Sequence, residues 1–194
     1  NNPELDVLGI SATSGNVSNK KGCQNIVNLL DYIGMFKEDF VYKGEDMADV
    51  DATDTHGNNG LGNYYIPESE KIWNTGAVNR IRTILRQYPN EVTIIALAPL
   101  STINKALVDE YIDLVKEVVI MGGAYRSPGN CSPMVEFNFW CDSESANELF
   151  ENFENCNKLR IVPLDITRKF VLTKDRIRTW KTFMPNITKF IEGI

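Results

Sequence analysis

The chain has 194 residues, 43% of them hydrophobic, which is enough material for one sizeable core and little for a second. Its 26 acidic and 20 basic residues give a net charge of −6, which excludes the basic character typical of nucleic-acid-binding proteins. The longest apolar runs fall well short of the roughly 20 residues of a membrane helix. We therefore expect a single domain over residues 1–194, with no nucleic-acid and no membrane partner.

The four cysteines are too few for a disulfide scaffold, and they lack the CxxC spacing of zinc or redox sites. Cys131 and Cys141 could meet if the segment between them forms a loop. Their disulfide state stays open at this point.

Apolar runs and helical periodicity alternate from the beginning of the chain. The apolar run Leu5–Ser11 predicts a buried strand, and the helix expected after it ends near Gly34. Residues 44–67 are rich in Asp, Asn, Gly and Thr and predict a long irregular loop. A second helix is expected from Ala77 to about Tyr88.

The alternation continues in the second half of the chain. Val92–Leu97 predicts a second buried strand, and Ser101 is a credible N-cap for a helix that continues through Val115. The other expected elements are a third strand at Glu117–Met121, a helix at Ser143–Phe153 and a fourth strand at Leu159–Leu164. Such alternation predicts an α/β fold, with an open, mostly parallel sheet and helices on both faces.

Ligands of parallel sheets bind beyond the carboxyl ends of the strands, so the loops there should converge on one crevice. These loops contain Gly15–Asn16, Leu97–Ala98, residues 122–138 and Asp165–Thr167. Within the third loop, Asn130, Glu136 and Asn138 offer donors and acceptors that suit a polyhydroxyl ligand. Gly122 and Gly123 would let the backbone pass close to it. The alternative is an ordinary polar loop with turn-forming Gly and Asn.

His56 is the one histidine of the chain, and it lies between aspartates and a glycine cluster. A single histidine can be an ordinary surface residue or part of a functional site, and the sequence leaves both open. The acidic residues around it lack the spacing of an EF-hand calcium loop, so we interpret the run as a solvated loop. The glycine motifs match neither a P-loop nor a dinucleotide turn, and Gly-x-Ser-x-Gly is missing.

Taken in order, these motifs resemble the inosine-uridine-preferring nucleoside hydrolase family. The matching segments are Leu8–Ile10 with Gly15–Asn16, His56–Gly57 with Gly60–Gly62, Ala98–Ser101, Met121–Gly123, Gly129–Asn130, Glu136–Asn138 with Asp142–Ala146, and Pro163–Thr167. Their order and intervals agree over nearly the whole chain. The resemblance implies a Rossmann-like fold and hydrolysis of the N-glycosidic bond of a small-molecule ribonucleoside, which gives ribose and a free purine or pyrimidine base.

The resemblance also implies a Ca²⁺ ion that orients the ribose diol and the attacking water, and an aspartate that takes the proton of this water. Asn16 is expected near the diol and the water, and Leu97 is expected to offer its backbone carbonyl to Ca²⁺. The implied sugar contacts are hydrogen bonds from Asn130, Glu136 and Asn138 and packing by Met121 and Phe137, with His56 facing the outer part of the nucleoside.

Two parts of the family pattern have no match in this sequence. Family members begin with an Asp-rich strand end that supplies metal carboxylates and the base, and they carry a later His-Asp pair. We therefore expect a domain truncated at both ends, with its base and acid outside the chain, that is inactive alone although its full-length parent is a Ca²⁺-dependent hydrolase. The alternative is a non-catalytic ribose- or nucleoside-binding homologue. Base preference, compartment (cytoplasmic or secreted) and homo-oligomer formation stay open.

Overall fold

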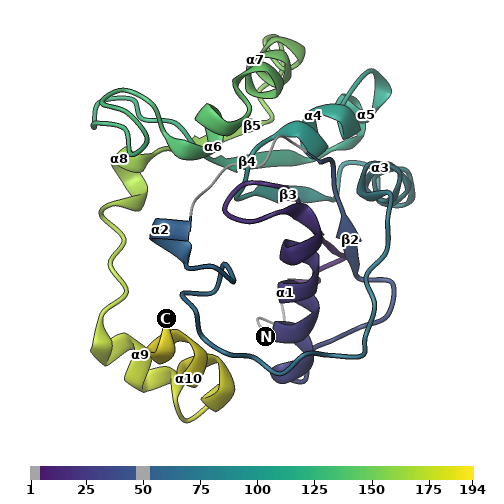
Figure 1. The fold of residues 1–194 in the computed structure, drawn as a ribbon. Helices are drawn as coiled ribbons and strands as arrows, with labels where there is room; N and C mark the ends of the chain where they lie inside the picture. The colour runs from purple at the N-terminus through teal and green to yellow at the C-terminus, as the bar shows by residue number, and fades with distance from the viewer. Residues whose placement is uncertain (1–4, 47–52) are drawn as a thin grey trace.

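The computed structural model describes residues 5–46 and 53–194, in which parallel strands alternate with helices (Figure 1). The strands of these residues form two hydrogen-bonded sheets, β1–β2 and β3–β4–β5. Every pairing within them is parallel. The α/β class with parallel strands is therefore confirmed, although hydrogen bonds divide the strands into two groups.

In chain order the elements are β1 (Ile10–Ala12), α1 (Asn19–Tyr32), β2 (Val41–Lys43), α2 (Thr53–His56), α3 (Ala77–Gln87), β3 (Thr93–Ala96), α4 (Ser101–Ala106), α5 (Glu110–Leu114), β4 (Glu117–Met121), α6 (Phe137–Cys141), α7 (Ser143–Asn152), β5 (Leu159–Val162), α8 (Leu164–Thr167), α9 (Lys174–Trp180) and α10 (Pro185–Gly193). The predicted third strand coincides with β4, and the helices predicted before Gly34, after Ala77 and after Ser143 are α1, α3 and α7.

Helices pack on both sides of the strands. On one face of the β1–β2 sheet, Val27 of α1 joins Phe40 and Val41 in an apolar cluster. On the other face, the guanidinium carbon of Arg80 in α3 lies 5.5 Å from the ring centre of Tyr42. Because successive strand residues point to opposite faces, α1 and α3 cover opposite sides of β2.

The larger core lies between β3–β5 and the helices α3, α4, α5 and α7. Leu85, Leu149 and Ile120 are fully buried in it. Ile95 points to the opposite face of β3 and is 67% exposed. The expectation that Val92–Leu97 forms a buried strand is therefore wrong for one face of the strand. The helices packed on this core cover the face that carries Ile94 and leave the face that carries Ile95 open.

The expected buried strand at Leu5–Ser11 is also shorter than predicted. β1 begins at Ile10, while Leu5 and Val7 are 71% and 53% exposed. The partner strand β2 has three residues, and the register pairs Ile10 with Val41. Residues before Ile10 thus extend beyond the strand that could pair with them.

The helix expected from Ser101 to Val115 is divided into α4 and α5. Asp109 has a left-handed φ of 48°, a conformation that cannot continue an α-helix. The expected N-cap is shifted by one residue, because the cap is Leu100 and Ser101 is the first helical residue.

Side-chain caps account for the starts of two other helices. The Ser18 hydroxyl accepts a hydrogen bond from the Lys21 amide at 3.4 Å at the start of α1. The Asp142 carboxylate accepts one from the Ser145 amide at 3.0 Å at the start of α7. Both satisfy backbone donors that would otherwise lack a partner. Gly34 follows α1 with φ of 70°, as expected for a glycine at a helix end.

Two glycines connect β4 to the part of the chain that carries α6. A Cβ atom on Gly122 would overlap the ring of Phe139, and Gly123 has a left-handed φ of 77°. Phe139 in turn meets Phe150 of α7 edge-on, with the ring centres 5.6 Å apart. The close approach that these glycines allow is therefore to an aromatic side chain of the protein, which seats α6 on the turn after β4.

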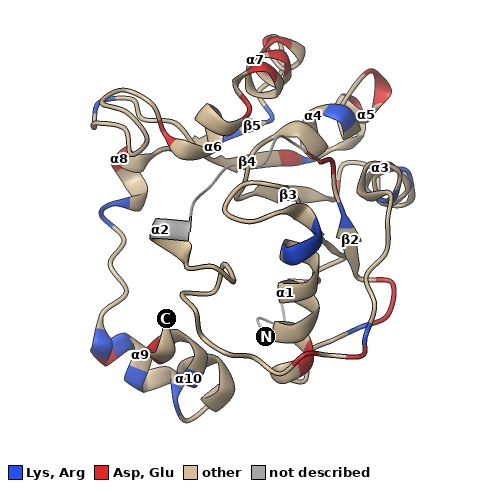
Figure 2. Cartoon of the chain, in the orientation of Figure 1, with Lys and Arg blue, Asp and Glu red and all other residues tan. Residues whose placement is uncertain are grey.

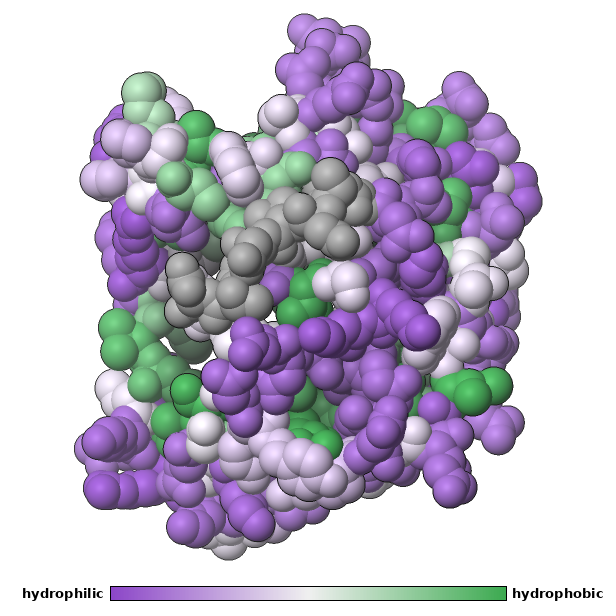
Figure 3. All heavy atoms as spheres, in the orientation of Figure 1, coloured by the Kyte–Doolittle hydropathy of each residue, from purple (hydrophilic) through white to green (hydrophobic). Residues whose placement is uncertain are grey.

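The surface shows charges of both signs. Acidic side chains gather on α7, while α9 carries several basic ones (Figure 2). On the face drawn in Figure 3 the hydrophobic residues form separate small areas within a mostly hydrophilic surface. None of the helices in the described ranges has the length and apolar character needed to cross a bilayer.

Removing a core side chain should cost far more than removing one from the open face of β3. Leu149→Ala is expected to lower the free energy of unfolding by about 2–5 kcal/mol, because Leu149 is fully buried. Ile95→Ala should cost less than about 1 kcal/mol, since Ile95 is 67% exposed. Urea unfolding of both variants checks this, and equal losses would contradict the assignment of the core to one face.

Gly122 and Gly22 should respond oppositely to alanine. Gly122→Ala is expected to destabilise the protein by about 1–3 kcal/mol, because its Cβ would displace Phe139. Gly22→Ala is the control and should be at least as stable as wild type, since Gly22 lies in α1, where alanine is favoured, and its Cβ would meet the Ala12 Cβ of β1 at 3.4 Å, an ordinary contact distance. Thermal unfolding compares them, and a Gly122→Ala protein as stable as wild type would contradict the packing.

Candidate functional site

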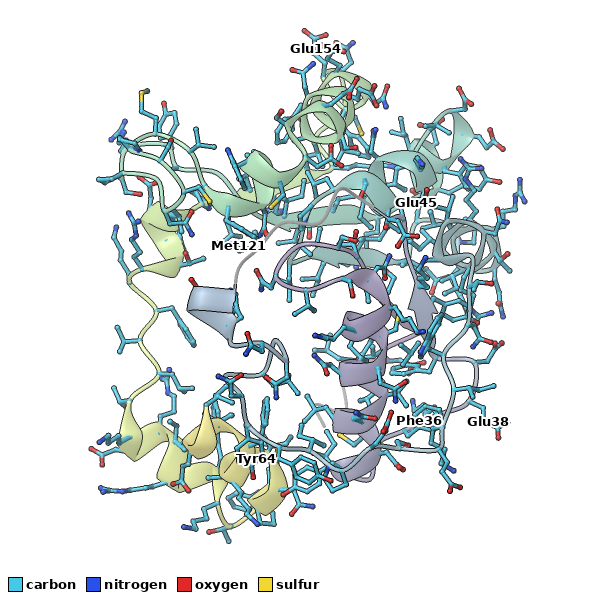
Figure 4. The ribbon with its side chains drawn as sticks, viewed as in Figure 1. Phe36, Glu38, Glu45, Tyr64, Met121 and Glu154 are labelled. Atoms are coloured by element: carbon cyan, nitrogen blue, oxygen red, sulfur yellow. The ribbon has the colours of Figure 1, made fainter. Side chains whose placement is uncertain are left out.

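A buried amide joins the carboxyl ends of β3 and β4. Asn138 lies on α6 and is 8% exposed. Its Nδ2 donates to the Met121 carbonyl at 3.0 Å and to the Leu97 carbonyl at 3.4 Å, and lies 3.3 Å from the Met121 Sδ. Met121 is seen at the end of β4, below α6, in Figure 4. Three of the predicted site residues thus meet at one edge of the strands.

Glu136 holds the backbone beside this amide. Its side chain is 2% exposed and caps the N-terminus of α6. Oε1 accepts from the Asn138 amide at 2.9 Å, and Oε2 accepts from the amides of Gly123 at 3.0 Å and Phe139 at 3.2 Å. Hydrogen bonds from backbone N–H groups stabilise a buried carboxylate. Glu136 therefore fixes α6 to the turn after β4, while its predicted contact with a sugar stays a prediction.

Asn130 closes the loop that precedes α6. Its Oδ1 accepts from the Phe137 amide at 2.9 Å, and its own amide donates to the Val135 carbonyl at 3.1 Å. The residue itself is exposed. Phe137 lies beside Trp140, with ring centres 6.4 Å apart. The Asn130 side chain thus sets the position of the first residue of α6.

The loop after β1 reaches the same edge. A Cβ on Gly15 would lie 3.3 Å from the Pro99 ring and 4.0 Å from the Phe137 ring. The hydroxyls of Thr13 and Ser101 lie 3.4 Å apart and join the loops after β1 and β3 a second time. Asn16, next to Gly15, is exposed. The loops after β1, β3 and β4, three of the four expected to converge, are thus brought together at this edge, while a ligand crevice between them stays a prediction.

The His56 segment is attached to other parts of the chain. The His56 carbonyl accepts from the Gly62 amide at 2.8 Å, and the Asn25 side chain of α1 donates to the Asn59 carbonyl at 2.8 Å. Tyr64, at the end of this segment, meets Phe190 of α10 edge-on at 5.6 Å (Figure 4). Among the described residues, no contact found here joins His56 to the Asn138 group, and its role in substrate binding stays a prediction.

Burial makes the Cys141 thiol of α6 a poor nucleophile. Cys131 and Cys141 are both free thiols, the first exposed and the second half-buried. Burial raises the pKa of the Cys141 thiol to about 11, so its reactive thiolate is scarce at neutral pH. The chemistry of the edge therefore comes from amide, carboxylate and carbonyl groups.

A calcium site requires several oxygen ligands, usually with carboxylates among them. Within the ranges that the structure describes, no three acidic, histidine or cysteine side chains are grouped to hold a metal ion. The Leu97 carbonyl is within hydrogen-bond distance of the Asn138 Nδ2, which is a donor. The described residues alone therefore do not fit a Ca²⁺ ion.

Comparison with known proteins gives a consistent result. The whole chain, residues 1–194, matches the family model "Inosine-uridine preferring nucleoside hydrolase". Uridine nucleosidase 1 of Arabidopsis thaliana is 32% identical over 185 residues, which are 89% of this chain and 53% of that protein. The non-specific ribonucleoside hydrolase RihC of Shigella flexneri is 32% identical over 184 residues, 91% of this chain and 59% of that protein.

A solved structure shows the same likeness. The purine-preferring ribonucleoside hydrolase from Gardnerella vaginalis superposes with a TM-score of 0.83 and 27% identity, covering 97% of this chain and 64% of that one. The chain thus spans less than two thirds of the length of each of these three relatives. The match over all 194 residues shows that the chain belongs to the inosine-uridine preferring nucleoside hydrolase family.

Proposed function

We propose that the whole protein carrying residues 1–194 hydrolyses the N-glycosidic bond of ribonucleosides. The observation that carries this is the buried Asn138, which gathers the ends of β3 and β4 in a chain that matches the family throughout. In the reaction the oxygen of water bonds to C1′ of the ribose while the bond from C1′ to the base nitrogen breaks. The base leaves with the electron pair and gains a proton, and ribose is the second product.

The hydrogen bonds already made define which atoms are left for a sugar. The Nδ2 of Asn138 is committed to the Met121 and Leu97 carbonyls, so its Oδ1 is the atom to accept a ribose hydroxyl. The Oδ1 of Asn130 is committed to the Phe137 amide, so its Nδ2 is the atom to donate. These two amides then supply one acceptor and one donor to neighbouring hydroxyls.

The other site residues take the places that the family pattern assigns to them. Asn16 lies at the ribose diol and the attacking water, Met121 and Phe137 pack against the sugar, and Glu136 contacts a ribose hydroxyl. His56 faces the outer part of the nucleoside. Support comes from the convergence of the Gly15 loop on Pro99 and Phe137, and from the position of Met121 beside Asn138.

Calcium dependence is part of the proposal for the whole protein and is separate from the chemistry of the described residues. Because the described residues do not group acidic ligands, the 194-residue chain alone is expected to be inactive. The same observation favours a second candidate function, a ribose- or nucleoside-binding protein without turnover.

A reducing-sugar assay with inosine and uridine separates these functions. The whole protein should release ribose and free base in buffer containing Ca²⁺, and a chelator should abolish release. Calorimetric binding of nucleosides without release would instead establish the binding protein. A whole protein that neither binds nucleosides nor releases ribose in buffer containing Ca²⁺ would contradict both functions.

Asn138→Ala in the whole protein tests the site directly. Loss of its hydrogen bonds should lower kcat/KM by about 30- to 1000-fold, or about 2–4 kcal/mol of transition-state stabilisation. The matched control is Asn147→Ala on α7, an exposed residue whose side chain donates to Glu151 at 2.7 Å. Steady-state kinetics and circular dichroism are measured on both variants. A folded Asn138→Ala protein with unchanged kcat/KM would remove Asn138 from the site.

A further inference from the structure

The loop between β4 and α6 has no apolar anchor of its own. None of the residues from Ala124 to Val135 is buried, and Tyr125 and Met134 are 79% and 83% exposed. A surface segment without buried apolar contacts depends on polar contacts for its order. The contacts that hold this loop to another element therefore determine where its functional side chains lie.

Asp165 of α8 binds the first part of the loop through the backbone. Its Oδ2 accepts from the Tyr125 amide at 2.9 Å, and its Oδ1 accepts from the Arg126 amide at 2.8 Å. The Ser127 hydroxyl donates to Oδ2 at 3.3 Å. These donors, the Tyr125 amide first, hold the pKa of Asp165 below that of a free aspartate. The carboxylate is thus ionised, and accepts all three bonds, at neutral pH.

Arg168 binds the next part of the same loop. One terminal nitrogen of its guanidinium donates to the Pro128 carbonyl at 2.7 Å, and the other donates to the Gly129 carbonyl at 3.0 Å. A planar guanidinium can span two neighbouring acceptors in this way. Asp165 therefore accepts hydrogen bonds from residues 125–127, and Arg168 donates hydrogen bonds to residues 128 and 129.

The residue that follows this stretch is Asn130. Its side chain accepts a hydrogen bond from the Phe137 amide at 2.9 Å. The position of residues 125–129 therefore affects where α6 begins. A backbone hydrogen bond also joins α8 to the turn after β4: the Leu164 amide donates to the Gly123 carbonyl at 2.9 Å. One turn of helix after β5 thereby fixes a loop that belongs to the end of β4.

We propose that Asp165 and Arg168 are positioning residues that hold the loop of residues 125–130 in the conformation that binds the sugar. This role rests on the proposed function, because the bound sugar is the one that Asn130 would contact. Both side chains are bonded to residues 125–129, so both act through the loop.

Asp165→Asn tests this role. An asparagine keeps one acceptor oxygen and directs an NH₂ group towards a backbone N–H, so one of the two amide contacts is lost. Hydrogen exchange of the Tyr125 and Arg126 amides should become at least about tenfold faster. The KM for the nucleoside should rise about tenfold with kcat nearly unchanged, because the ground state and the transition state lose the same contact. Asp175→Asn is the matched control, since Asp175 on α9 is bonded to Arg178 at 3.1 Å.

Arg168→Lys is a second variant that keeps the charge. A single ammonium cannot span the Pro128 and Gly129 carbonyls as the guanidinium does, so the same rise in KM is expected. Arg178→Lys on α9 is its control, with wild-type kinetics.

Exchange and kinetics together decide the outcome. Unchanged exchange in Asp165→Asn, or faster exchange with an unchanged KM, would overturn the positioning role while the wild type remains an active hydrolase. A wild type that neither binds nor hydrolyses nucleosides would defeat the proposed function and this role with it. Hydrogen exchange can be measured on a protein without enzymatic activity. Failure of the positioning role can therefore be distinguished from failure of the proposed function.

Discussion

The arrangement of the site depends on the side-chain amide of Asn138, which donates hydrogen bonds to two backbone carbonyl groups. The parallel register pairs Ala96 with Ile120, so the residues that follow them, Leu97 just after β3 and Met121 at the end of β4, lie at the same level. Asn138 donates to both carbonyls from a nearly buried position. A buried polar group without a partner costs about 1–3 kcal/mol, so this bridge stabilises the arrangement in which α6 lies against the ends of β3 and β4. Residues from three separate elements thereby keep fixed positions at one edge.

Two kinds of contact surround this bridge. From inside, Glu136 gathers three backbone amides and Phe139 fills the space above Gly122. From outside, two charged side chains of opposite sign hold an exposed loop: Asp165 of α8 and Arg168, the C-cap residue of that helix. The inner contacts are buried and belong to the fold, while the outer ones lie at the surface and have the lower local stability. Adjustment of this edge to a ligand is therefore expected in the loop rather than at the ends of the strands.

The sequence predicted the long periodic elements and the meeting of the loops, and it failed where tertiary contacts decide. α1, α3 and α7 were predictable because each has several turns of periodic apolar residues. The three-residue β2 was missed because so short a strand has no periodicity, and α6 was missed because glutamate is not a favoured N-cap residue. The exposure of Ile95 could not be predicted, since an apolar run does not tell which of its faces a helix will cover. Residue type indicated that Glu136 contacts a ligand, which stays a prediction, and its hydrogen bonds to three backbone amides could not be predicted because they depend on how the chain folds around it.

The central claim is that a ribose binds at the joined ends of β3 and β4. A crystal structure of the whole protein with ribose or a slowly hydrolysed nucleoside tests it most directly. We expect a sugar hydroxyl within hydrogen-bond distance of the Asn138 Oδ1, with the ring packed against Met121 and Phe137. A sugar bound at another place on the molecule, with Asn138 still bonded only to the Leu97 and Met121 carbonyls, would contradict the account.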